Sequence, residues 1–113
     1  MKSLPKEITT YLVAHALEKR SPAYLCIGRN AVLKEFGGDT ARYGIGSLTR
    51  GSSALDQVPF LEGLLPLRQP SLVLPCVQID SGNKADVHII SDGSKHWVLL
   101  LSIVEEEIEH LHL

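Results

Sequence analysis

The sequence predicts an α+β domain in which an N-terminal helix is followed by two groups of antiparallel strands. Three observations predict this fold: helical spacing of the apolar residues within 6–20, a hairpin signature at Gly28-Arg29-Asn30, and three later apolar segments separated by turn sequences. At 113 residues the chain can bury one modest hydrophobic core but not two. One domain is therefore expected.

Residues 6–20 are predicted to form an amphipathic helix. Its start signal is Pro5 and its stop signal is Ser21-Pro22. The apolar stripe is wide enough to cover a sheet or to pair with a second copy of itself. A two-fold contact needs such a self-complementary patch, so a homodimer is expected. The predicted dimer interface consists of Leu4, Ile8, Tyr11, Leu12 and Val13.

The strand predictions rest on short apolar segments bounded by turn residues. In the hairpin, Gly28 or Asn30 supplies the positive φ that a tight turn requires. The last three strands are expected to form an antiparallel meander. The strands are predicted over residues 23–27, 31–36, 72–79, 85–90 and 96–104.

The region between the two groups of strands is rich in glycine and short of bulky apolar residues. It is predicted to be loops with one helical turn near residues 39–43. Residues 53–65 are predicted as a short helix that is capped by Ser53 and starts anew at Pro59. The chain thus divides into a helix over 1–20, a core over 21–104 and an acidic exit segment over 105–113.

Charge and hydropathy exclude several classes of partner. Eleven Lys and Arg against 13 Asp and Glu give a net charge of -2, which provides no basic surface for nucleic acid. No apolar run is long enough to span a bilayer, and the N-terminus lacks the pattern of a signal peptide, so a cytoplasmic protein is expected. Cys26 and Cys76 stand apart, which predicts reduced thiols buried as small apolar residues rather than a disulfide or a zinc site.

Several phrases of the sequence, in this order of elements, resemble a bacterial subgroup of PAS domains, found in signalling proteins such as cyclases and histidine kinases. The resemblance covers about residues 21–104, and the phrase that begins at Pro59 is its most distinctive part. The phrases are Ser21-Pro-Ala-Tyr-Leu, Phe36-Gly-Gly-Asp, Tyr43-Gly, Pro59-Phe-Leu-Glu-Gly-Leu-Leu-Pro-Leu, Ala85-Asp-Val-His-Ile and Trp97-Val-Leu-Leu-Leu.

The resemblance implies a five-stranded antiparallel sheet with short helices on one face, the other face being available to the N-terminal helix or to a second protomer. It implies a sensory or regulatory module in signal transduction, which acts through dimerisation on an effector domain or a signalling partner. Many PAS domains end the last strand with an Asp-(Ile/Val/Ala)-Thr junction that couples the core to the output. Here the matching place is Ser102-Ile103-Val104, which departs from that pattern.

A second binding function is a cavity for a small-molecule ligand between the sheet and the short helices. Haem-binding PAS domains commonly use a His on the helix before the central strands, and residues 53–65 contain none. Neither cysteine stands in the Asn-Cys-Arg-Phe phrase of flavin-adduct photosensors, so haem and flavin are disfavoured and the cofactor is left open. The candidate lining residues are Cys26, Tyr43, Phe60, Leu61, Leu64, Val87, Trp97 and Leu99, although dense packing of a small core would fill the same space.

Catalysis is not expected, because no acid, base or nucleophile set with a known motif is present. The alternative function is a small α+β enzyme with a cone-shaped pocket, in which Asp56, Asp86 or Tyr43 does acid–base work. His88 and His96 lie on neighbouring predicted strands, but two ligands do not make a strong metal site. No metal site is therefore predicted.

Overall fold

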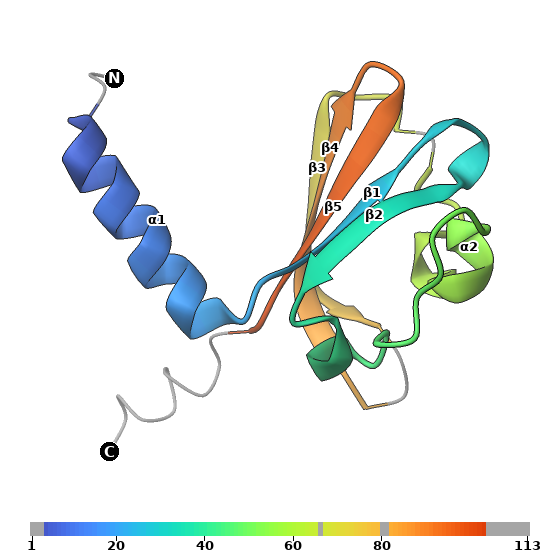
Figure 1. The fold of residues 1–113 in the computed structure, drawn as a ribbon, viewed down its shortest axis with the longest axis horizontal. Coiled ribbons are helices and arrows are strands. Elements are labelled where there is room, and N and C mark those ends of the chain that lie inside the picture. Colours follow the sequence, from blue (N-terminus) through green and yellow to red (C-terminus); the bar gives the residue numbers. More distant parts are fainter. Residues whose placement is uncertain (1–3, 66, 80–81, 104–113) are drawn as a thin grey trace.

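The computed structural model describes residues 4–65, 67–79 and 82–103, and Figure 1 shows their arrangement. The helices are α1 (Lys6–Arg20), α2 (Ala54–Gln57) and the 3-10 turns η1 (Arg29–Ala31), η2 (Thr40–Tyr43) and η3 (Pro59–Leu61). The strands are β1 (Ala23–Ile27), β2 (Leu33–Gly38), β3 (Ser71–Gln78), β4 (Lys84–Asp92) and β5 (Lys95–Leu101).

The strands form one five-stranded antiparallel sheet in the order β2-β1-β5-β4-β3. The predicted α+β class, with a five-stranded antiparallel sheet and short helices, is confirmed. The N-terminal hairpin and the C-terminal meander are joined by the pairing of β1 with β5, in which Cys26 lies opposite Trp97. The first and last strands of the fold therefore lie side by side in the middle of the sheet.

The hydrophobic core lies between one face of the sheet and the short helices. Strand residues that alternate toward this face, such as Leu25, Val87 and Leu100, are fully buried. From the other side, Val58 and Leu61 of the α2–η3 region and Tyr43 of η2 complete the same cluster. The predicted short helices thus cover the core on the side opposite the sheet.

The predicted cap at Ser53 and new start at Pro59 are confirmed, but the helical residues are Ala54–Gln57 and Pro59–Leu61 rather than the whole of 53–65. The Ser53 hydroxyl accepts a hydrogen bond from the Asp56 N–H at 3.4 Å, as expected of an N-cap. Pro59 opens η3, because its fixed φ suits the first position of a helical turn and its missing N–H ends the preceding one. The chain therefore makes two short turns here instead of one regular helix.

Only the first strand has the predicted bounds; β2 ends at Gly38, β4 at Asp92 and β5 at Leu101 rather than at residues 36, 90 and 104, and residue 104 lies outside the described residues, as does the predicted exit segment 105–113. The second strand begins at Leu33 rather than at residue 31, because Asn30 and Ala31 both take positive φ and complete a 3-10 turn first.

In β3 the pairing register with β4 shifts between Leu74 and Val77, and Cys76 has a φ of 53°. Cys26 is buried as predicted, but the prediction that Cys76 is buried is wrong, because it lies exposed in this bulge of an edge strand. Pro75 lies in this bulge on an edge strand, where a residue without an N–H is tolerated.

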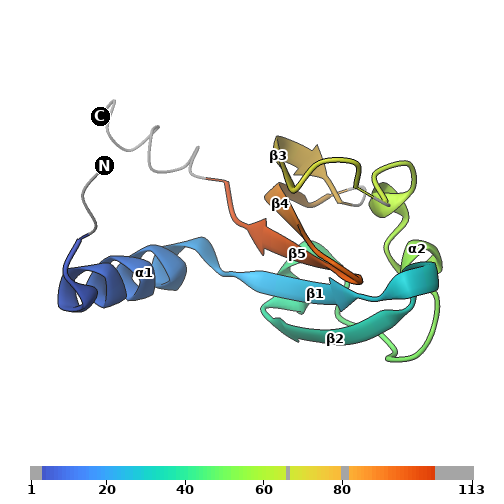
Figure 2. The same cartoon turned by 90° about the horizontal axis from the view of Figure 1, so that it is seen from above.

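Helix α1 projects away from the sheet, as Figures 1 and 2 show, and does not cover the core. Its predicted bounds are confirmed, and it ends at Ser21 in the left-handed conformation. Ile8 and Leu12 are each 47% exposed, and Tyr11 is 65% exposed. These three share one side of the helix, whereas Val13 lies roughly 100° around the axis from Leu12. Leu4, which is 57% exposed, lies just before the helix begins. We call Leu4, Ile8, Tyr11 and Leu12 the α1 stripe.

No helix in the described ranges has the length and apolar content needed to cross a membrane.

Candidate functional site

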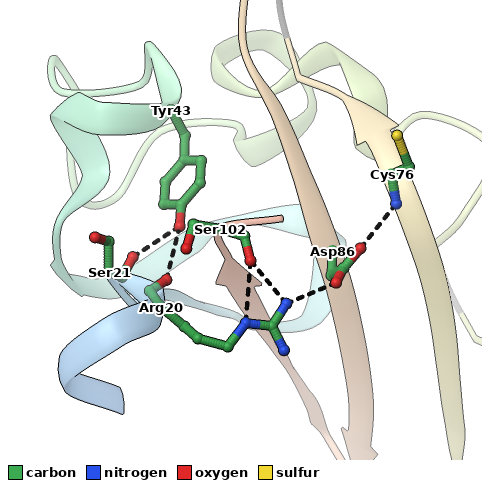
Figure 3. Close-up of polar contacts among 6 residues, drawn as sticks. All are labelled: Arg20, Ser21, Tyr43, Cys76, Asp86 and Ser102. Atoms are coloured by element: carbon green, nitrogen blue, oxygen red, sulfur yellow. Dashed lines mark hydrogen bonds and ion pairs between the residues drawn. The ribbon is translucent and has the colours of Figure 1, made fainter. Parts of the chain in front are cut away.

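The two ends of the core meet at a polar cluster centred on Arg20, the last residue of α1 (Figure 3). Its guanidinium Nε and Nη2 donate to the Ser102 carbonyl at 3.0 and 2.7 Å, and Nη2 also donates to Asp86 Oδ2 at 2.6 Å. In return, the Ser102 N–H donates to the Arg20 carbonyl at 2.8 Å. The residue that follows β5 is thus held at both its backbone groups by one residue of α1. We call this cluster the terminal junction.

Tyr43 supports the terminal junction from the side of the short helices. Its hydroxyl donates to the Ser21 carbonyl at 2.7 Å and lies 3.3 Å from the Arg20 carbonyl. Its ring is buried in the core, and this burial raises the pKa of the hydroxyl, which therefore stays a neutral donor. The bond satisfies a carbonyl at the C-terminus of α1, where the helix itself leaves carbonyls without partners.

Asp86 ties the terminal junction to the edge of the sheet. Its Oδ2 pairs with Arg20, and its Oδ1 accepts the Cys76 N–H of the β3 bulge at 2.9 Å. Partial burial acts to raise the pKa of this carboxyl, but the Cys76 N–H and the Arg20 guanidinium together outweigh it and hold the pKa below its ordinary value. Asp86 is therefore a carboxylate with a fixed partner on each oxygen.

This pairing has a consequence for stability in acid. Because the folded pKa of Asp86 is lowered, its stabilising contribution is present above the unfolded value of about 3.9 and is lost as the pH falls through the folded value. Urea unfolding at a series of pH values should show that the difference in unfolding free energy between the native protein and Asp86→Asn shrinks below about pH 4. In proteins that also carry Arg20→Met, the effect of Asp86→Asn on the unfolding free energy should depend less on pH. Parallel curves for the native protein and Asp86→Asn across this range would contradict the assignment.

In the described part of the chain, the sheet face opposite the core carries a partly exposed apolar surface, where the Lys95 ammonium lies 5.2 Å from the centroid of the Trp97 ring. By strand alternation it contains Tyr24, Leu99 and Trp97, with Ile90 beside Trp97 in the pairing of β4 and β5. The rings of Tyr24 and Trp97 lie 6.2 Å apart. Ile90 is 50% exposed, and Val73 on β3, opposite His88, is 56% exposed. We call this surface the outer face.

The structure does not bring the predicted cavity residues together. Tyr43, Leu61 and Val87 are packed in the core, and Phe60 and Leu64 lie partly buried against it. Three others, Cys26, Trp97 and Leu99, alternate to the outer face, so the sheet separates them from the rest. Alternation along β5, where Val98 and Leu100 are the buried residues, was the signal in the sequence that could have separated the two sets.

An open cavity of about 550 Å³ lies at one end of the sheet, beside the β1–β2 and β4–β5 turns. Ile27, Leu55 and Leu65 contribute apolar walls, and Arg29 and His96 contribute polar groups. His96 Nε2 accepts the Leu67 N–H at 3.3 Å. None of the eight predicted lining residues contributes to this cavity, because its walls come from the ends of β1 and β5, from α2 and from turns rather than from the middle of the sheet.

The residues considered for acid–base or metal chemistry are dispersed. Tyr43 and Asp86 belong to the terminal junction, whereas Asp56 lies exposed in α2. His88 alternates to the outer face and His96 lines the cavity. Among the described residues, no three His, Cys, Asp or Glu side chains come together as metal ligands.

The sequence matches no protein-family model and no curated protein. The function is therefore argued from three features of the molecule, which are the terminal junction, the α1 stripe with the outer face, and the cavity at the sheet end.

Proposed function

We propose that the chain is a PAS-type regulatory module of cytoplasmic signalling proteins, which acts as a homodimer and is not an enzyme. The observation that carries this proposal is that, within the described residues, the α1 stripe is exposed and the apolar outer face is partly exposed. The five-stranded antiparallel sheet with short helices on one face supports the PAS resemblance, which implies this architecture.

A second copy of the chain is the partner that fits both surfaces at once. In a two-fold arrangement, each α1 covers the outer face of the other protomer, so that every helix–sheet contact is formed twice. The lengths agree, because 15 helical residues span about 22 Å at 1.5 Å per residue and the seven residues of β5 span about 23 Å at 3.3 Å per residue. Each large apolar side chain that becomes fully buried contributes about 1.5–3 kcal/mol.

Substitution of Leu12 by glutamate tests the helix side of this dimer. The native chain should have the mass of a dimer in native mass spectrometry, and Leu12→Glu should have the mass of a monomer, because the association would bury an unpaired carboxylate. Thr10→Glu adds the same charge on the opposite side of α1 and should remain dimeric. A Leu12→Glu protein that stays dimeric would show that α1 does not form the interface.

Small-molecule binding at the sheet-end cavity is the second candidate function, and the cavity itself is the observation that favours it. Its volume of about 550 Å³ lies within the range of 300–1,000 Å³ that is usual for small-ligand sites. Its walls are mostly apolar, while Arg29 and His96 offer hydrogen bonds. The same native spectra report on it, because a bound ligand adds a reproducible mass that disappears on denaturation. If no added mass is found, dimerisation alone remains as the proposal.

A further inference from the structure

Three parts of the chain meet at Arg20: the end of α1, strand β4 through Asp86, and the residue that leaves β5, Ser102. In the described part of the chain, the hydrogen bonds that tie α1 to the sheet are all made by this last residue of the helix. The rest of α1 projects away from the sheet (Figures 1 and 2). The direction of α1 relative to the sheet therefore depends on the terminal junction.

We propose that Arg20 couples α1 to the C-terminal exit of the domain, so that a change in the direction of α1 displaces Ser102. The inference rests on the proposed function only in taking α1 as the element that a partner protomer holds. It assigns to Arg20 and Asp86 the role that the PAS resemblance gives to the Asp-(Ile/Val/Ala)-Thr junction, which this sequence lacks at Ser102-Ile103-Val104.

The chemistry of the guanidinium suits this role. Its planar fork presents N–H groups in fixed directions, and two of its nitrogens contact one carbonyl while Nη2 also contacts the carboxylate. A lysine at this position keeps the charge but offers a single ammonium on a flexible stem, so it cannot fix the orientation in the same way. The backbone bond from the Ser102 N–H to the Arg20 carbonyl pins the same two residues a second time.

The coupling extends to the edge of the sheet through Asp86. One of its oxygens holds Arg20 and the other holds the Cys76 N–H of the β3 bulge. Arg20 and Asp86 side chains are only 26% and 23% exposed, so the pair is largely shielded from competing water. The terminal junction is thus held by two strands, β4 and β3. A movement of the end of α1 therefore acts on Ser102.

A distance distribution between two spin labels measures the direction of α1 directly. Labels are placed on Thr10→Cys in α1 and Ser71→Cys at the start of β3, both exposed, after replacing Cys26 by alanine and Cys76 by serine. The labelled protein is diluted with excess unlabelled protein, so that the measured pairs lie within one chain. The measurement is repeated with Leu12→Glu, in which no partner is expected to hold α1.

A single narrow distribution is expected while Arg20 is present, and Arg20→Met should lose that narrow peak. Arg20→Lys should be intermediate in width, and Lys19→Met, which removes the neighbouring exposed charge, should retain the narrow peak. If Arg20→Met gives the same width as Lys19→Met in the Leu12→Glu background, the coupling proposal is overturned.

Two readouts keep this result separate from the dimer proposal. Light scattering on the same samples gives the oligomeric state, so a Leu12→Glu protein that remains dimeric counts against the interface. The widths of the distance distributions still test the role of Arg20 in that case. Should Arg20→Met fold poorly, a second measurement is made on Arg20→Lys, namely the hydrogen-exchange rate of the Ser102 amide. Faster exchange than in Lys19→Met supports the coupling, and equal exchange overturns it.

Discussion

Replacing Leu61 with alanine is expected to lower the free energy of unfolding by about 2–5 kcal/mol, the usual cost of removing a fully buried leucine side chain. Leu61 ends η3, has no exposed surface and packs against the core cluster beneath the sheet. The loss combines the transfer free energy of the removed methyl groups with the cost of the cavity that remains. Urea unfolding of the two proteins, followed by circular dichroism, measures it.

The size of this loss also decides between two interpretations of the space under the sheet. If Leu61 lined an open ligand cavity, its truncation would enlarge a space that water already enters, and the loss would be less than about 1 kcal/mol. Phe60→Ala is the matched control, because its ring is only partly buried beside the same cluster. A loss at Leu61 no larger than at Phe60 would contradict the assignment of Leu61 to the packed core.

Much of the secondary structure could be predicted because its signals are local. The bounds of α1 follow from helical spacing and from Ser21-Pro22, since a residue before proline is disfavoured in the α region. The break between α2 and η3 follows from Pro59, and the cap of α2 from Ser53. In each case the residue that sets the start or end of a helix lies within one turn of that helix end in the sequence.

The terminal junction could not be predicted, because its contacts join residues far apart in the sequence. Arg20 is 66 residues from Asp86 and 82 from Ser102, and no spacing rule relates them. As a sequence feature Arg20 is only a basic residue in the last turn of a helix, a common placement that favours the helix dipole. Its specific role appears only once β1 and β5 are paired in the centre of the sheet.

The predicted cavity residues were correctly expected to be apolar residues of the sheet and the short helices. The prediction did not assign each strand residue to one face of the sheet. Aromatic and aliphatic residues of β5 alternate between two faces that are both apolar, so composition alone does not separate Trp97 and Leu99 from Val98 and Leu100. The pairing with β1 separates them, because Leu25, opposite Val98, faces the core. An apolar face on each side of a sheet predicts that both are covered, and within the described residues only the core face is fully covered.

Glutamate in place of Leu99 is expected to convert the dimer into monomers while leaving the protomer folded. Leu99 lies near the middle of the outer face, between Tyr24 on β1 and His88 on β4. Leu99 is partly exposed, so in a monomer the new carboxylate can reach water, but covering it with the α1 of a partner would desolvate an unpaired charge, which costs several kcal/mol. Arg68→Glu, at an exposed position outside the sheet, is the control and should stay dimeric.

Mixing two separately disabled chains distinguishes a helix–sheet interface from pairing of the two α1 helices. In a two-fold dimer of Leu12→Lys with Leu99→Glu, one helix–sheet contact carries both substitutions and the other is entirely native. The mixture should therefore recover dimers that neither variant forms alone, with the lysine and glutamate in the substituted contact opposite in charge. If the α1 helices paired only with each other, Leu99→Glu would remain dimeric by itself. Sedimentation velocity of each variant and of the equimolar mixture separates the two arrangements, because only a contact between α1 and the outer face makes the two defects complementary.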